Sequence, residues 1–277
     1  MRNIRKITQT MQLIATARVQ KCLQRATASR PYTDKITEMV QTLSGLETLD
    51  HPLLQANESA RRAIMLTITS NRGLCGSYNA ATLRTAVAHR HKLVEEGLTP
   101  ELEMVGKKGI GYMRFLGQTL TETVTDVDDR IAYARVSDMA ERYMKLYEAG
   151  EVARVEVCYM RFHSIGVQRP TVAQLLPIEP PESDDEQQRK ARPDFEFSPP
   201  PEVLLGRLIP ETVKIRLYQY FNDAIVSEQV SRMIAMKAAT DAAGDMIKFL
   251  SRQYNRARQT AITTELADIV GGAAAVE

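Results

Sequence analysis

Residues 211–270 constrain this chain more than any other segment, because they contain no proline and one glycine, Gly244. A helical pattern that continues beyond about 25 residues is typical of a coiled coil or a membrane span. At 1.5 Å per residue, roughly 60 residues form a rod of roughly 90 Å. A membrane span is excluded, because charged residues recur on every turn. These residues are Lys214, Arg216, Asp223, Glu228, Arg232, Lys237, Asp241, Asp245, Lys248, Arg252 and Arg256. We therefore expect one long helix with a mechanical or bridging role.

The same segment carries a 3.5-residue repeat, which is typical of a coiled-coil seam. Its members are Met236, Thr240, Ala243, Ile247, Leu250, Tyr254, Ala257 and Ala261. Several members are small, so the backbone of a partner helix can come close. A seam of small residues also buries little area per residue, so we expect the partner to run alongside most of the rod. The main seam residues are predicted to be Met236, Ala243, Ile247, Leu250 and Tyr254.

The other end of the chain offers a partner, because residues 1–30 contain neither glycine nor proline. This stretch has apolar residues mostly three or four positions apart: Ile4, Ile7, Met11, Ile14, Ala15, Val19 and Leu23. The spacing predicts a second helix, which could continue to Ser44 and Gly45 if Pro31 only bends or locally opens it. The two terminal helices can then form an antiparallel pair. The alternative is that each packs on the middle of the chain as an ordinary amphipathic helix.

The middle of the chain alternates between strand and helix patterns, which predicts a mainly parallel sheet covered by helices. We expect strands at 63–69, 101–105, 119–124, 152–159 and 172–178. Helices are expected at 80–94, 106–115 and 137–149. The fold class is therefore α/β, a doubly wound, Rossmann-like sheet with a closing hairpin, joined to a long antiparallel coiled coil. The predicted divisions are a helix at 1–57, an α/β domain at 58–204 with a proline-rich acidic loop at 179–201, and a helix at 205–277.

Composition excludes several classes of protein. The three cysteines, Cys22, Cys75 and Cys158, lie too far apart for a disulfide framework or a CxxC site. The four histidines do not cluster with cysteine or aspartate at a metal spacing, so we expect no metal. No apolar run is long enough for a signal peptide or a membrane span. We expect a cytosolic protein, or one on the reducing side of a membrane.

The net charge of +2 is unevenly distributed. The residues that precede the first acidic residue, Asp34, include only basic charges: Arg2, Arg5, Lys6, Arg18, Lys21, Arg25 and Arg30. A basic helix suits nucleic acid, a membrane surface or an acidic protein partner, and it can equally be a solvated face.

Two loops could carry chemistry, and we find no convincing reaction centre in either. The glycine-rich loop 106–111 follows a strand and opens a helix, where helix N–H groups could bind phosphate. It matches neither the GxxxxGK(S/T) loop nor the GxGxxG fingerprint, so we expect an ordinary turn. Cys75 in loop 70–77 could be a nucleophile, but no histidine follows nearby in the sequence. Two competing functions stay open: a nucleotide-binding α/β enzyme with helical oligomerisation arms, and a coiled-coil adaptor that binds nucleic acid through residues 2–30.

Several stretches of the chain resemble one family, the gamma subunit of rotary F-type ATP synthases. They follow one another in the order of the family and together span nearly the whole chain. The stretches are KIT at 6–8 with Met11 and Ala15, SNRGLCG at 70–76 with Asn79, SRMIAM at 231–236, YNRARQ at 254–259, and the end of the chain from Ile262 to Ala275.

The resemblance implies a non-catalytic central rotor shaft that couples transmembrane proton flow to ATP synthesis and hydrolysis. It implies that the terminal helices enter a hexamer of alpha and beta subunits, and that the α/β domain sits with epsilon on the membrane c-ring. The implied contacts of the shaft with beta subunits are Met11, Arg258, Gln259 and Thr263. No cofactor, nucleic acid or small-molecule substrate is implied. The implied location is peripheral, at the cytoplasmic face of the bacterial cell inner membrane.

The chain departs from the family pattern at two places. Asn71 stands where the family usually has an acid, so an ion pair at that position is not carried over. The family also has further helical residues before the KIT motif, whereas this sequence starts at Met1, close to the motif. Either the true start lies upstream of Met1 or the first helix is shortened, and in the second case we expect a reduced contact between the first and the final helix.

Overall fold

The computed structural model describes residues 1–44, 51–178 and 201–274. A long helix opens the chain and a longer one closes it: α1 spans Arg2–Ser44 and α6 spans Pro201–Ala274. The elements between them are η1 (Pro52–Leu54), β1 (Arg62–Ile68), α2 (Tyr78–Glu95), β2 (Thr99–Val105), α3 (Lys107–Phe115), β3 (Glu122–Val124), α4 (Tyr133–Glu148), β4 (Val152–Ser164) and β5 (Val167–Leu176). The acidic loop predicted at 179–201 lies outside the described residues, except for Pro201.

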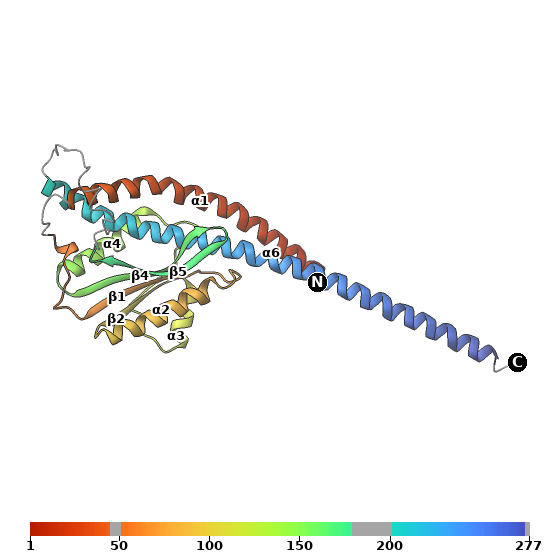
Figure 1. The fold of residues 1–277 in the computed structure, drawn as a ribbon. Helices are drawn as coiled ribbons and strands as arrows, with labels where there is room; N and C mark the ends of the chain where they lie inside the picture. Colours follow the sequence, from red (N-terminus) through yellow and green to blue (C-terminus); the bar gives the residue numbers. More distant parts are fainter. Residues whose placement is uncertain (45–50, 179–200, 275–277) are drawn as a thin grey trace, which may run out of the picture.

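The two terminal helices lie side by side and run in opposite directions, and the C-terminal part of α6 projects beyond the N-terminus (Figure 1). At 1.5 Å per residue, the 43 residues of α1 span about 65 Å and the 74 residues of α6 about 110 Å. α1 is therefore too short by about 45 Å to cover α6. The predicted antiparallel pair is confirmed, with a long unpaired end.

Both terminal helices continue through a proline, Pro31 in α1 and Pro210 in α6. A proline removes one backbone hydrogen bond and crowds the preceding turn, which usually ends a helix. Packing holds α6 in place around Pro210, because Ile209 and Val213 are fully buried. α6 therefore begins earlier than its proline-free stretch predicts.

The middle of the chain forms a five-stranded sheet with the strand order β3-β2-β1-β4-β5. β1 is parallel to β2 and β4, β2 is parallel to β3, and β5 is antiparallel to β4. This topology confirms the predicted parallel sheet with a closing hairpin. The two hairpin strands are longer than predicted, because their pairing continues to Ser164 and Val167 beside the turn. β3 is shorter, with three residues.

Helices cover both faces of the sheet: α2 and α3 lie on one face, and α4 and the helix pair lie on the other (Figure 1). The side chains of β1 alternate accordingly, as strand geometry requires. Ala63 and Met65 belong to the core beneath α2 and α3, whereas Ile64 and Leu66 belong to the core beneath α4 and α6. Residues of α6 between 209 and 230 are part of that second core. α6 therefore packs on the sheet and also pairs with α1, which combines the two arrangements considered from the sequence.

Candidate functional site

Small side chains close the seam between the terminal helices over the part of α6 that α1 covers. Met236 and Ala243 are buried. Between them Thr240 donates a hydrogen bond from its hydroxyl group to Thr8 Oγ1 at 2.8 Å. Small residues at a helix–helix seam let the backbones approach closely, so the two helices are held together along this length.

Farther along α6 the predicted seam residues become exposed. Ile247 is half-buried, Leu250 is 44% exposed and Tyr254 is 67% exposed. Met1 and Arg2 line an open cavity together with these three residues. The start of α1 therefore lies beside this part of α6, and the 3.5-residue repeat continues beyond the end of its partner.

Beyond the seam, α6 is a lone helix on which every residue from 248 to 272 is exposed. Arg258, Gln259 and Thr263 lie on this tail, so these predicted partner contacts face solvent. The tail also exposes large apolar side chains: Tyr254, Ile262, Leu266, Ile269 and Val270. Exposed apolar residues at helical spacing mark a surface that another protein can cover.

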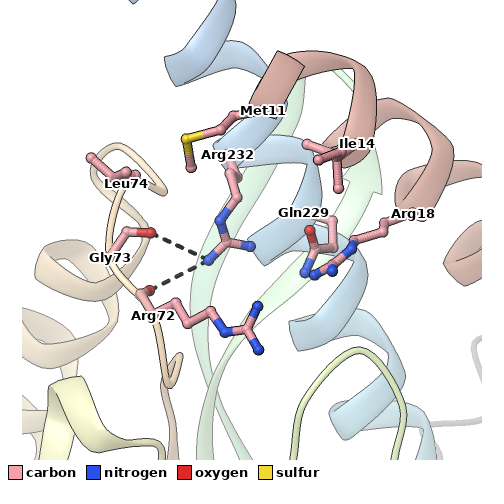
Figure 2. Close-up of a pocket in the computed structure, with 9 residues that line it drawn as sticks. Met11, Ile14, Arg18, Arg72, Gly73, Leu74, Gln229 and Arg232 are labelled. Atoms are coloured by element: carbon pink, nitrogen blue, oxygen red, sulfur yellow. Dashed lines mark hydrogen bonds between the residues drawn. The ribbon is translucent and has the colours of Figure 1, made fainter. Parts of the chain in front are cut away.

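Met11 lies elsewhere, where the helix pair meets the α/β domain. It lines a cavity of about 330 Å³ together with Ile14, Ala15, Arg18, Arg72, Gly73, Leu74, Gln229 and Arg232. Figure 2 shows Met11 beside Arg232 of α6, with Leu74 on the loop opposite. The structure therefore does not bring Met11 together with the predicted contacts on the tail.

The loop opposite Met11 is SNRGLCGS at 70–77, which follows β1. Leu74 has a φ of 63° and is 61% exposed, although residues other than glycine rarely adopt this backbone conformation. The next residue, Cys75, is buried, and its sulfur accepts a hydrogen bond from Asn79 Nδ2 at 3.2 Å. No histidine within the described ranges hydrogen-bonds Cys75, so the geometry does not support a nucleophile here. The turn instead exposes the apolar side chain of Leu74 to solvent.

Arg232 ties this loop to α6. Its Nη2 donates to the carbonyl oxygens of Arg72 and Gly73, each at 3.4 Å, as Figure 2 shows. The same nitrogen pairs with Glu228 Oε1 at 2.6 Å, one turn earlier on α6. Burial raises the pKa of the Glu228 carboxyl group above its ordinary value, and the charge of Arg232 opposes that shift. The nearly buried ion pair of Arg232 and Glu228 on α6 therefore contacts the loop at 70–77 and holds it against the helix.

Asn71 ties the same loop to the segment that follows β3. Its Nδ2 donates to the carbonyl oxygens of Thr125 at 2.9 Å and Val127 at 2.7 Å. Its Oδ1 accepts a hydrogen bond from the backbone N–H of Lys107 at 3.1 Å. A carboxylate at this position could not donate the first two bonds. The asparagine is thus a connecting residue between two loops and the start of α3.

The segment after β3 also reaches both terminal helices through Asp129, which accepts hydrogen bonds from Arg18 of α1 and Gln229 of α6. Sequence reasoning gave Asp129 no role. The available signal was the three acidic residues Asp126, Asp128 and Asp129, in a chain whose first helix is strongly basic.

The candidate phosphate loop at 106–111 is filled by the protein itself. The first three N–H groups of α3 donate to Asn71 Oδ1, Ser70 O and Thr69 Oγ1. A side chain at Gly106 would place its Cβ 2.3 Å from Thr69 O, so this glycine permits the close approach of two strand ends. These N–H groups are therefore not available to a phosphate.

Buried titratable groups elsewhere are paired or kept neutral. Glu103 accepts a hydrogen bond from the Tyr143 hydroxyl at 2.6 Å, and Glu156 lies 2.5 Å from His89 Nε2. Burial raises the pKa of the Cys158 thiol to about 12, which makes it a poor nucleophile. Within the part of the chain that the structure describes, no group of three His, Cys, Asp or Glu residues could hold a metal ion. None of the described helices is both long and apolar enough to cross a lipid bilayer.

The sequence matches known proteins over nearly its whole length. A profile of the ATP synthase family matches residues 1–276. A protein of Rhodopirellula baltica called ATP synthase gamma chain is 42% identical over 100% of this chain and 95% of the relative. A protein of the same name from Saccharopolyspora erythraea is 39% identical over 99% of this chain and 94% of the relative.

Among the solved structures with a similar fold are two chains of mitochondrial ATP synthases. A chain of the central stalk and c-ring of the Tetrahymena thermophila mitochondrial ATP synthase has a TM-score of 0.60 and 20% identity, and the match covers 84% of this chain and 99% of that chain. A chain of the Euglena gracilis mitochondrial ATP synthase rotor has a TM-score of 0.54 and 17% identity, over 95% and 100% of the two chains. At these identities the likeness concerns the fold alone.

Proposed function

The chain belongs to the family of ATP synthase gamma chains, and from this premise we propose that it is the central rotor shaft of an F-type ATP synthase. In this role it couples transmembrane proton flow to ATP synthesis and hydrolysis in a hexamer of alpha and beta subunits. One observation carries the proposal: α6 continues about 45 Å beyond α1 as a lone helix that exposes apolar residues. Such a helix is suited to insertion into a surrounding protein.

The geometry supports the transmission of torque. A pair of packed helices is stiffer than a single helix, and the pair is anchored on the α/β domain at one end while the tail is free at the other. The domain lies to one side of the pair (Figure 1), so the rotor has no rotational symmetry. A rotor with unlike sides contacts each beta subunit differently at each angle, and different contacts shift the subunits toward different nucleotide states.

We infer that the chain serves the enzyme complex without catalysing the reaction itself. The competing function, a nucleotide-binding enzyme, requires phosphate donors at 106–111, and these N–H groups are bonded to protein atoms. The other competitor, a nucleic-acid adaptor, would use the basic residues of α1. Two of them, Arg18 and Arg25, instead hydrogen-bond Asp129. Four others, Arg2, Arg5, Lys6 and Lys21, are exposed, so this competitor is disfavoured by the family membership and not by the geometry of α1.

We propose the partners and the division of the chain that the sequence predicted. The segments 1–57 and 205–277, which contain α1 and most of α6, form the shaft, and the domain at 58–204 sits with epsilon on the c-ring. Met11 contacts beta subunits near the domain, and Arg258, Gln259 and Thr263 contact them along the tail. We place the chain at the cytoplasmic face of the bacterial cell inner membrane, held there by its partners, because the curated relatives described above are bacterial.

Reconstitution with alpha and beta subunits of the same organism tests the proposal. The purified chain alone should not hydrolyse ATP. Mixed with the two subunits, it should co-purify in one complex that hydrolyses ATP and turns an attached probe in one direction. Steady ATP turnover by the chain alone, cleared of contaminants, would overturn the rotor assignment, and so would its failure to join the complex.

A further inference from the structure

Asp129 contacts both shaft helices from the segment between β3 and α4. Arg18 Nη1 of α1 lies 2.9 Å from Asp129 Oδ1 and 2.8 Å from Oδ2. Gln229 Nε2 of α6 donates to the same Oδ1 at 2.9 Å. The backbone carbonyl of Asp129 accepts a further hydrogen bond from Arg25 Nη1 at 3.0 Å. Cys22 Sγ of α1 also donates to this carbonyl oxygen, at 3.7 Å. A single residue of the α/β domain therefore bonds three residues of α1 and one of α6.

The segment that carries Asp129 is itself fixed to the sheet. Asn71, three residues after the end of β1, donates hydrogen bonds to the carbonyl oxygens of Thr125 and Val127. Asn71 also accepts the first N–H group of α3. The segment that carries the Asp129 carboxylate is thus bonded through Asn71 to the loop after β1 and to the start of α3. Because these bonds fix the segment to the sheet, a displacement of the domain also displaces Asp129.

The bonds of Asp129 differ in kind from the apolar contacts around them. Apolar burial is non-directional, so helices can slide or turn on an apolar surface while burying similar areas. A charge-assisted hydrogen bond to a guanidinium group has a narrow preferred geometry. Gln229 is 2% exposed, so it cannot exchange its bond to Asp129 for bulk water without opening the helix pair. The Arg18 and Asp129 side chains are 35% and 37% exposed, whereas the bond from Gln229 is sheltered. Together these bonds add a directional restraint on rotation of the helices to the apolar packing of α6 against the sheet.

We propose that Asp129 is a positioning residue that locks α1 and α6 to the α/β domain, so that rotation of the domain turns the shaft without slip. The proposal rests on the rotor function proposed above. It assigns to Asp129 the coupling of rotation, and no part in the chemistry of ATP.

Membranes that carry the full ATP synthase with Asp129→Asn or Asp129→Ala in this chain test the proposal. We expect normal amounts of assembled complex and retained ATP hydrolysis, with most of the proton-driven ATP synthesis and ATP-driven proton pumping lost. Asp126→Asn is the matched control, because Asp126 is an exposed acid of the same segment that lies 3.6 Å from Arg135. The control should keep the coupling of the unmodified complex.

A parallel loss of synthesis, hydrolysis and assembled complex would overturn the proposal, because it would show a structural role only. Gln229→Leu provides an independent variant, since it removes the α6 bond and leaves Arg18 in place; it should lower synthesis more than hydrolysis. A probe on the α/β domain of the Asp129→Asn complex, with the hexamer immobilised, should show wider angular fluctuations than in the unmodified complex. Fluctuations of equal width would also overturn the proposal.

The same experiment separates this inference from the rotor assignment. If the unmodified chain fails to restore synthesis to membranes that lack it, the rotor function is wrong. If the unmodified chain restores synthesis and both Asp129 variants do so equally well, the lock alone is wrong.

Discussion

Thr8 and Thr240 are 232 positions apart in the chain, and their hydroxyl oxygens lie 2.8 Å from each other. They join α1 to α6 within a seam that is otherwise made of apolar side chains. Thr240 Oγ1 also lies 2.8 Å from Met236 O of its own helix. The pair therefore fixes the register of the two helices where the seam residues are too small to do so by shape.

Replacing Thr240 with valine tests this register. Thr240→Val keeps the shape of the side chain but removes the hydroxyl group, so it should lower the free energy of unfolding by about 0.5–1.5 kcal/mol. Thr8→Val should lower the free energy of unfolding less in the Thr240→Val variant than in the unmodified chain, because contacting residues are energetically coupled. Urea unfolding of both single variants and the double variant measures the coupling. Thr260→Val is the control, because the Thr260 hydroxyl is exposed and bonds only Arg256 O of its own helix. Strictly additive effects would contradict the contact.

A larger side chain at Ala243 should force the helices apart. Ala243 is 7% exposed in the seam, and Ala242 beside it is exposed. We expect Ala243→Leu to lower the free energy of unfolding by about 1–3 kcal/mol through overpacking. Ala242→Leu should change it little, because the added side chain stays in solvent. Thermal unfolding followed by circular dichroism compares the two variants, and equal stability would show that α1 does not approach α6 at this position.

The seam shows what sequence periodicity can and cannot predict. Along the predicted 3.5-residue repeat, Met236 and Ala243 are buried, and Thr240 between them bonds Thr8 of α1. Leu250 and Tyr254 continue the same repeat but are largely exposed. Periodicity identifies a face of a helix, whereas the length of contact depends on where the other helix begins, and no pattern within α6 contains that information.

The stability of the chain should depend on the protonation of Glu228. Burial raises its folded-state pKa above the unfolded value, so its contribution is fully present below the unfolded pKa and is lost as pH rises through the folded one. Glu228→Gln stays neutral and lacks this loss. The unfolding free energy of the unmodified chain should therefore fall relative to Glu228→Gln as pH rises from about 4 to about 7. Urea unfolding across this range measures the difference, and a constant difference would contradict the prediction.

Asn71→Asp should destabilise this chain, although the resemblance puts an acid at this position. The carboxylate would face the carbonyl oxygens of Thr125 and Val127 with no proton to donate, at a cost of about 1–3 kcal/mol. The bond from the Lys107 N–H would remain. Urea unfolding measures the change, with Asn255→Asp on the exposed tail as the control. A variant as stable as the unmodified chain would show that the amide group of Asn71 is not needed.

The contacts of the loops around the helix pair could not be predicted from the sequence. SNRGLCG was recognisable as a motif, but its bonds to Arg232 join positions that are about 160 residues apart. Asp129 carries no motif, and its role depends on three elements that meet only in the fold. The candidate phosphate loop needed the same information, because only the structure shows that Thr69, Ser70 and Asn71 occupy its N–H groups.

The exposed tail gives the final prediction, which concerns Arg258, Gln259 and Thr263. All three face solvent, so replacing them together with alanine should leave the helix content and the melting temperature of the isolated chain unchanged. If they bind beta subunits, coupled ATP synthesis by the reconstituted complex should fall by about tenfold, as expected for the loss of roughly 1.4 kcal/mol. The matched control replaces Lys237, Asp241 and Asp245, which are exposed on the part of α6 that pairs with α1. Its synthesis rate should fall less. Equal rates for the unmodified chain and the tail variant would show that these side chains make no contact that matters for coupling, and that the tail acts through its apolar residues alone.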